Sequence, residues 1–156
     1  MDDRQLQALA DRMAITDLMA RYADRIDAND PEGSSACFAE GGVGIYWGEY
    51  QGRAAIAERL RGILRQFTAT SHHLSNVLIE LDGDRATGQS YVYAFHRFAA
   101  DGRFMHVWGR WVDELVRVDG DWYFARREVV LVGRMNEGNP PADREGLPGH
   151  PGRLPM

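Results

Sequence analysis

Hydrophobic positions recur at helical spacing in the first part of the chain. Over residues 2–30 they fall on one stripe with a period of about 3.6 residues, which predicts an amphipathic helix. A similar stripe predicts a second long helix over residues 53–67. Between the two, we expect a loop at Asp30–Gly33 and a short helix over residues 34–38. Residues 43–50, rich in β-branched and aromatic types, predict a strand.

Alternating patterns begin at residue 72 and predict a meander of four strands. The expected strands cover residues 72–81, 85–97, 104–117 and 121–132. An Asp-Gly pair stands at each of the three junctions, and this dipeptide is a strong signal for a hairpin. Helices followed by antiparallel strands predict an α+β fold, in which a curved sheet wraps over the N-terminal helices as a cone. The mouth of such a cone suits one small apolar ligand.

The end of the chain differs in composition from the rest. From residue 134 onward it holds five of the six prolines and four glycines, and it shows no periodicity. We therefore expect one domain over residues 1–133 and an extended arm over residues 134–156, lying over the domain or over a partner subunit. Plain disorder of this arm is the alternative.

Composition and charge exclude several classes of function. The net charge of -5 and the scattered basic residues argue against electrostatic binding to nucleic acid or to an anionic membrane. No apolar run approaches the roughly 18 residues of a membrane span, and the polar N-terminus does not resemble a signal peptide. We therefore expect a cytoplasmic protein. All 18 basic residues are arginine, which removes lysine Schiff-base chemistry, and the single Cys37 excludes an internal disulfide.

Histidine is the side chain best suited to acid–base chemistry near neutral pH. Four histidines lie on predicted strands, where successive side chains point to opposite faces: His72, His73, His96 and His106. Only one of the adjacent pair His72 and His73 can face the interior of the cone, and periodicity alone does not say which. One face of the third meander strand mixes aromatic and polar groups, as a pocket wall does: Phe104, His106, Trp108 and Arg110.

A histidine base needs a carboxylate that fixes its tautomer. Asp24, Asp27 and Asp30 end the first predicted helix. Asp24 lies opposite the apolar stripe, whereas Asp27 lies at its edge, about 100° from its centre. Asp27 is therefore the acid best placed to reach inward, with a solvated or helix-capping carboxylate as the alternative.

Aromatic and arginine side chains supply further candidates for substrate binding. Tyr46 and Trp47 stand in a predicted strand and suit an aromatic substrate, with core packing as the alternative. Tyr22 shares the buried helical stripe, and its hydroxyl needs a partner. Arg126 and Arg127 point to opposite faces of the last strand, so one of them is a candidate for the cavity, with a surface ion pair as the alternative. No spacing of histidines and carboxylates typical of a metal site is present.

Four segments resemble the SnoaL-like proteins of the nuclear-transport-factor-2-like superfamily, which are α+β cones. The run Ala14–Asp27 resembles their opening helix, and Gly52–Ile56 resembles the entry to their second helix. Thr70–Val77 resembles their histidine-bearing strand, read as H-x-x-x-N, and Asp119–Arg127 resembles their final hairpin. The similarity spans roughly residues 5–132 and implies the same fold.

Within this family, the pattern is most similar to the branch of scytalone dehydratase, lindane dehydrochlorinase and bile acid 7α-dehydratase. The resemblance places the branch's helix-end aspartate on Asp27 and its catalytic histidine on His72, four residues before Asn76. It implies a cofactor-independent and commonly trimeric enzyme. His73 is then expected to point away from the pocket.

These observations predict a lyase of dehydratase or dehydrohalogenase type for a small cyclic, hydrophobic substrate, with no cofactor and no metal. His72 is expected to abstract a proton from carbon, and Asp27 to orient it. The expected substrate-binding residues are Tyr22, Tyr46, Trp47, His106, Trp108 and Arg110, with His106 or Arg110 assisting the leaving group. Two alternatives stay open: a ketosteroid-isomerase-like or polyketide-cyclase-like enzyme whose carboxylate is the base, and a non-enzymatic ligand-binding or assembly subunit. We expect a homo-oligomer, either a trimer or a dimer.

Overall fold

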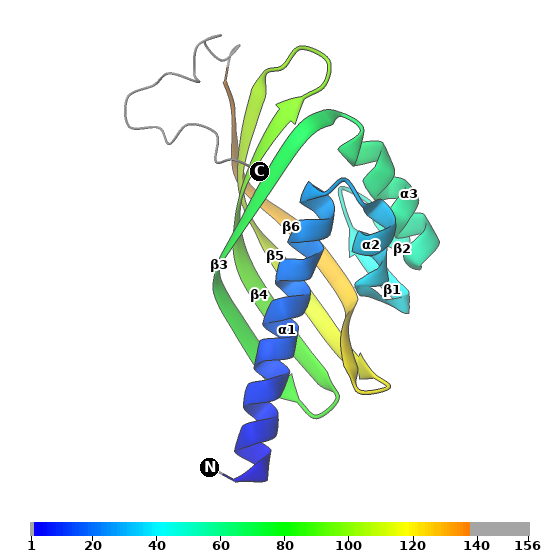
Figure 1. The fold of residues 1–156 in the computed structure, drawn as a ribbon, viewed down its shortest axis with the longest axis vertical. Helices are drawn as coiled ribbons and strands as arrows, with labels where there is room; N and C mark the ends of the chain where they lie inside the picture. Colours follow the sequence, from blue (N-terminus) through cyan, green and yellow to red (C-terminus); the bar gives the residue numbers. More distant parts are fainter. Residues whose placement is uncertain (1, 138–156) are drawn as a thin grey trace.

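A curved sheet of six strands carries three helices on one side (Figure 1). The computed structural model describes residues 2–137, and these counts refer to that range. The helices are α1 (Asp3–Asp27), α2 (Pro31–Ala36) and α3 (Arg53–Leu64). The strands are β1 (Phe38–Ile45), β2 (Glu49–Gln51), β3 (Phe67–Asp82), β4 (Arg85–Phe98), β5 (Phe104–Val118) and β6 (Asp121–Glu137).

The sheet has the strand order β2-β1-β6-β5-β4-β3. Strands β3 to β6 form the expected antiparallel meander, and β1 pairs with β6 in parallel. The predicted α+β fold, with a curved sheet over the N-terminal helices, is confirmed. The sheet as a whole is mixed, because the chain passes through α3 between the β1–β2 hairpin and the meander, and β6 then runs beside β1 in the same direction.

The Asp-Gly pairs form the hairpin turns of the meander, as their sequence predicts. Asp119 and Gly120 both have positive φ, at 52° and 93°. A turn of type I′ requires left-handed backbone at both central positions, and its twist matches that of the flanking strands. The short turn therefore fixes the register between β5 and β6.

The segment between α1 and α3 differs from the prediction. Asp30 caps α2 by accepting a hydrogen bond from the Gly33 backbone N–H at 2.8 Å, and Pro31 occupies the first turn. A proline at this position starts a helix because its missing N–H has no helical partner in any case. The expected loop at Asp30–Gly33 is therefore wrong. The single strand expected over residues 43–50 is instead a hairpin, broken at Trp47, whose φ is 57°.

The predicted apolar stripe of α1 is buried against the sheet. Its members Ile15, Leu18, Met19, Tyr22 and Ile26 are each at most 6% exposed. The helix begins with a capping box between Asp2 and Gln5 and ends at Asp27, three residues before the predicted end. The last turn of α1 thus lies beside the first half of β3.

A bulge in β3 changes which side chains face the core. The register moves from Ser75 opposite Tyr91 to Leu78 opposite Gln89, which leaves one extra residue in β3. Asn76 adopts a left-handed backbone within this bulge, with φ at 49°. Simple alternation assigns Leu78 to the face of His72, but Leu78 is 64% exposed and Ile79 packs on the core instead.

Strand β6 continues to Glu137, beyond the end expected at residue 132. Residues 138–156 of the predicted arm lie outside the described residues. Among the helices of residues 2–137, we find no segment with both the length and the apolar character needed to cross a bilayer.

Candidate active site

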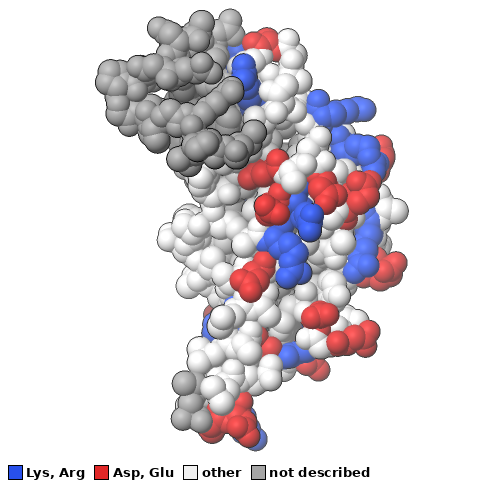
Figure 2. All heavy atoms as spheres, viewed as in Figure 1, with Lys and Arg blue, Asp and Glu red and all other residues white. Residues whose placement is uncertain are grey.

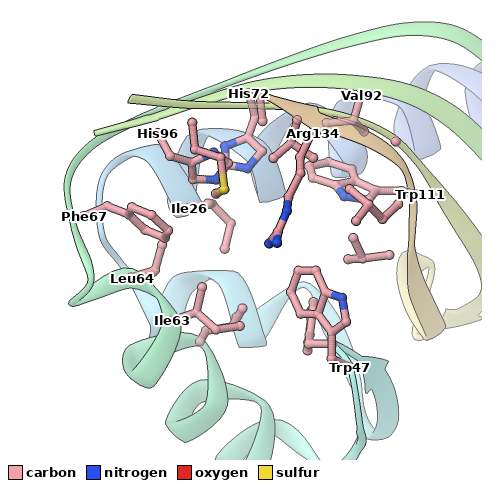
Figure 3. Close-up of a pocket in the computed structure, with 18 of the residues that line it drawn as sticks. Ile26, Trp47, Ile63, Leu64, Phe67, His72, Val92, His96, Trp111 and Arg134 are labelled. Atoms are coloured by element: carbon pink, nitrogen blue, oxygen red, sulfur yellow. The ribbon is translucent and has the colours of Figure 1, made fainter. Parts of the chain in front are cut away.

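A cavity of about 370 Å³ lies between the helices and the concave face of the sheet (Figure 3). Ile26 of α1 and Leu64 of α3 line one side, Trp111 of β5 lines the other, and Trp47 stands opposite the sheet. Most of the exposed wall is apolar, with a few polar side chains among aliphatic and aromatic groups. This combination is typical of sites for small organic molecules.

The end of α1 and the first half of β3 bring Asp27 and His72 together. The Asp27 Oδ1 atom lies 2.7 Å from His72 Nδ1, and Oδ2 accepts a hydrogen bond from the His72 backbone N–H at 2.8 Å. The Thr70 hydroxyl donates a third hydrogen bond to Asp27 Oδ1, also at 2.8 Å. Both carboxylate oxygens are therefore engaged, and the His72 ring is held between α1 and the cavity.

These donors determine the charge of Asp27. Partial burial would raise the pKa of the Asp27 carboxyl, but the hydrogen bonds from the His72 ring and backbone, and that from Thr70, outweigh this effect. The pKa therefore lies below its ordinary value, and Asp27 is a carboxylate near neutral pH. A carboxylate at this distance favours the tautomer with hydrogen on Nδ1, which leaves Nε2 as the acceptor nitrogen. His72 is one of the residues that line the cavity.

His96 of β4 lies beside His72 in the same wall (Figure 3). The two imidazole rings meet edge to face, with centroids 5.3 Å apart. Burial, and then the neighbouring His72, lower the pKa of His96 to about 4, so its ring is neutral at neutral pH. Its Nδ1 is buried and has no hydrogen-bond partner within residues 2–137.

Two tyrosine hydroxyls meet at another part of the cavity wall. The hydroxyls of Tyr22 and Tyr46 lie 2.7 Å apart, and both side chains are buried. Burial raises the pKa of Tyr22 to about 12 and that of Tyr46 well above its ordinary value. Both phenols therefore stay protonated near neutral pH. One hydrogen bond between them uses one of two O–H donors, and the other remains for a ligand.

A buried ion pair supports this wall from behind. Arg127 donates from Nε and Nη2 to the two oxygens of Asp113, both at 2.7 Å, and neither side chain is exposed. The Arg127 guanidinium also lies over the rings of Tyr22 and Trp111, at 4.5 and 4.3 Å. Arg127 is therefore the inward-facing member of the predicted pair, but it belongs to the core and does not line the cavity. Arg126 lies on the other face and contacts Glu128.

The structure places His72, Tyr22, Tyr46 and Trp47 in the wall of one cavity, with Asp27 behind His72. It places two other predicted residues, His106 and Trp108, away from the cavity. His106 and Trp108 lie on the convex face of the sheet, with Tyr93 between β5 and β3. Arg110 lines the cavity, and its guanidinium lies over the Tyr91 ring, 5.9 Å from the centroid.

The expectation that His106 and Trp108 line the pocket is therefore wrong, whereas Arg110 does line it. Strand alternation correctly groups them, but the concave face of β5 carries the odd-numbered residues, including Val107 and Trp111. His73 likewise points to the convex face, where its ring packs on Tyr93.

Four polar residues that line the cavity are absent from the predicted site residues: Arg59, Gln66, His96 and Arg134. His96 shares a face with Val92 and Ala94, and that apolar alternation marks an inward-facing position. Arg134 stands where proline- and glycine-rich composition suggested an arm. Strand β6 has a bulge between Leu131, which pairs with Gly109, and Gly133, which pairs with Trp108. This bulge turns Arg134 toward the concave face. Sequence alone carries no signal for that bulge.

The fold and the cavity define an α+β protein whose curved sheet encloses a small-molecule site with a histidine–aspartate pair. The chain belongs to the family of the SnoaL-like domain, whose model matches residues 7–128. This places it among the nuclear-transport-factor-2-like proteins, as the sequence resemblance implies. No curated protein sequence matches the chain.

Several solved structures are similar to this one. A putative scytalone dehydratase from Novosphingobium aromaticivorans has 33% identity and a TM-score of 0.78, over 85% of this chain and 94% of that one. A protein of unknown function from Mycobacterium tuberculosis has 32% identity and a TM-score of 0.74, over 84% and 76%. A type 3 hexachlorocyclohexane dehydrochlorinase from Novosphingobium barchaimii has a TM-score of 0.79 over 88% and 99%, and its 18% identity shows a shared fold alone.

Proposed function

We propose that this protein is a cofactor-independent lyase that eliminates water or hydrogen halide from a small cyclic, hydrophobic substrate. The observation that carries this proposal is the 2.7 Å contact between Asp27 and His72 in the wall of an apolar cavity. Family membership and a dehydratase-like structural neighbour support the same class of reaction.

His72 is the base in this mechanism. Asp27 holds the hydrogen on Nδ1, and the Nε2 lone pair takes a proton from carbon next to the leaving group. The electrons of that C–H bond form the new double bond, and the leaving group departs with its own bonding pair. The imidazolium that results is stabilised by the Asp27 carboxylate, and it can return the proton to a departing hydroxyl. General-base catalysis of this kind contributes about 10²- to 10⁴-fold in rate.

The tyrosine pair suits the leaving group. Tyr22 and Tyr46 are neutral donors in an apolar wall, and the unused O–H of the pair can bind a departing oxygen or halide. A hydrogen bond in such surroundings is stronger than one in water. This role replaces the one expected for His106 or Arg110, whose side chains pack on Tyr93 and Tyr91.

The isomerase or cyclase alternative requires the carboxylate itself to be the base. Asp27 already accepts three hydrogen bonds, and it lies behind His72 rather than in the cavity wall. Its lowered pKa makes it a weak base. Both facts favour His72 as the proton acceptor. The binding-subunit alternative does not need the Asp27–His72 contact at all.

The test is a product analysis on a panel of small cyclic alcohols and chlorides that carry an acidic C–H. Mass spectrometry detects loss of water or hydrogen chloride by the wild type, by His72→Ala and by the matched control His73→Ala. The control removes the adjacent imidazole on the convex face. We expect the wild type and His73→Ala to turn over a member of the panel, and His72→Ala to be slower by about 100-fold or more.

Two results would count against the lyase. A product of unchanged mass would indicate an isomerase or a cyclase. Near-wild-type elimination by His72→Ala, in a variant that melts like the wild type, would show that another group is the base.

We also propose that copies of the chain associate through the convex face of the sheet. Apolar side chains there are exposed by between 36% and 64%: Leu78, Tyr91, Trp108, Val112 and Met135. Register places them in adjacent rows across β3, β4, β5 and β6. Exposed apolar side chains gathered on one face in this way are typical of an interface. Charged side chains gather instead over the helices, whereas the visible edge at β3 is largely uncharged (Figure 2).

A further inference from the structure

The cavity differs in charge from the molecule that contains it. The chain has 23 acidic and 18 basic residues, so acids are in excess overall. Within residues 2–137, however, the cavity is lined by three arginines, Arg59, Arg110 and Arg134, and by no aspartate or glutamate. Asp27, the nearest acid to the site, lies behind His72 and is engaged by three donors.

The three arginines are not equivalent. The Arg59 guanidinium donates to the Tyr46 carbonyl at 3.0 Å and lies over the Tyr50 ring. The Arg110 guanidinium lies over the Tyr91 ring. Arg134 alone extends its guanidinium into the middle of the cavity, between the histidines and Trp47 (Figure 3). It makes no hydrogen bond or ion pair with any other residue in the range 2–137.

A guanidinium in an apolar cavity, without a partner in the described part of the chain, favours an anionic ligand. A guanidinium presents its N–H donors as a fork that matches a carboxylate, and such charge-assisted pairs are about twice as strong as neutral hydrogen bonds. Removal of water by a hydrophobic ring beside Trp47 and Trp111 would strengthen the pair further. Among residues 2–137, the wall offers no protein carboxylate to compete for it.

We propose that the natural substrate is a small cyclic carboxylic acid, whose ring fills the apolar cavity and whose carboxylate is bound by Arg134. This inference rests on the proposed function only for the reaction that the acid undergoes, since its carboxylate is bound by Arg134 and not by His72. The carboxylate would fix the ring by one end, and the carbon that loses its proton would lie toward His72. Arg134 is thus a specificity-determining residue.

The test compares two probes of nearly equal shape by isothermal titration calorimetry. Naphthalene-2-carboxylate carries the charge, and naphthalene-2-carboxamide lacks it. Each is titrated into the wild type, Arg134→Gln and the control Arg126→Gln, which removes an arginine from the convex face. We expect the wild type and the control to bind the carboxylate at least 10-fold more tightly than the carboxamide. Arg134→Gln should lose that preference and bind the two probes alike.

Equal binding of both probes by the wild type, binding of neither, or an unchanged preference in Arg134→Gln would each overturn the inference. A thermal melt of Arg134→Gln establishes that the variant is folded, and Arg134→Lys, which keeps a point charge without the fork, should retain part of the preference. If the protein eliminates from a neutral substrate and shows no preference for a carboxylate, this inference alone is overturned. Carboxylate binding without His72-dependent elimination would overturn the proposed function alone.

Discussion

His96 links the chemistry of the cavity to the stability of the protein. Burial, and then the nearby His72, hold the pKa of His96 at about 4, compared with an ordinary value of 6.5. The unfolded chain therefore takes up a proton on this residue at a higher pH than the folded protein does. The free energy of unfolding falls as the pH drops from about 6.5 toward 4, because protons stabilise the unfolded state first.

We predict that this single group reduces the free energy of unfolding by about 2 kcal/mol between pH 7 and pH 5. Urea denaturation of the wild type and His96→Gln at both pH values measures the effect. The variant has no titrating group at this position, so its loss of stability over the interval should be smaller by that amount. Equal losses in the two proteins would show that His96 is protonated in the folded state at pH 5.

The buried pair of Asp113 and Arg127 predicts a different pattern. Removal of one partner leaves a buried charge without its counterion, which costs about 3–5 kcal/mol. Arg127→Met or Asp113→Leu alone should therefore destabilise the protein strongly, whereas the double variant should recover much of the loss. Urea denaturation of the two single variants and the double variant forms the thermodynamic cycle. Additive losses would contradict the coupling that the 2.7 Å contacts indicate.

The sequence predicts both Asp27 and His72 as site residues. For Asp27, helix-edge geometry and the family resemblance independently favour the same aspartate. The inward direction of His72 rather than His73 was implied by the resemblance and not by alternation. Arg134 could not be predicted, since its direction depends on a bulge in β6 that leaves no mark in local composition. The error over His106 and Trp108 has another cause: an aromatic and polar face suits a pocket and a convex surface equally well.

Among the elements, the helices and the meander follow from periodicity and the Asp-Gly turns. Simple alternation fails in β3 because it assumes a regular pleat, and the bulge at Asn76 exchanges the two faces. His72 precedes the bulge and Ile79 follows it, so both reach the concave side. The spacing of His72 and Asn76 thus has a structural reason. The bulge at Asn76 allows the first half of β3 to line the cavity and the second half to pack on the core.

This reason predicts the outcome of substitutions at Asn76. Asparagine and glycine tolerate a left-handed backbone, whereas a β-branched residue does not. Asn76→Val should lower the free energy of unfolding by about 1–2 kcal/mol, and the matched Asn76→Gly should be close to the wild type. Thermal and urea denaturation measure both. A Val variant as stable as the Gly variant would mean that the bulge is not needed for the fold.

At the scale of the whole molecule, the convex face predicts self-association. A stable interface buries about 800 Å² on each partner, and a charge placed at its centre is costly to bury. Trp108→Glu should therefore shift the mass measured by sedimentation velocity from an oligomer to the monomer. Ala54→Glu adds the same charge to the exposed surface of α3 and should leave the oligomer intact. A monomeric wild type, or an oligomeric Trp108→Glu, would contradict association through this face.

The Asp27–His72 pair is tested most directly by nitrogen-15 NMR of the His72 ring at neutral pH. Proton abstraction requires hydrogen on Nδ1, facing Asp27, and a free lone pair on Nε2, facing the cavity. We predict the Nδ1–H tautomer in the wild type and loss of this preference in Asp27→Ala, with His73 unchanged in both proteins. An Nε2–H tautomer in the wild type, or a His72 tautomer that does not respond to Asp27→Ala, would contradict His72 as the base.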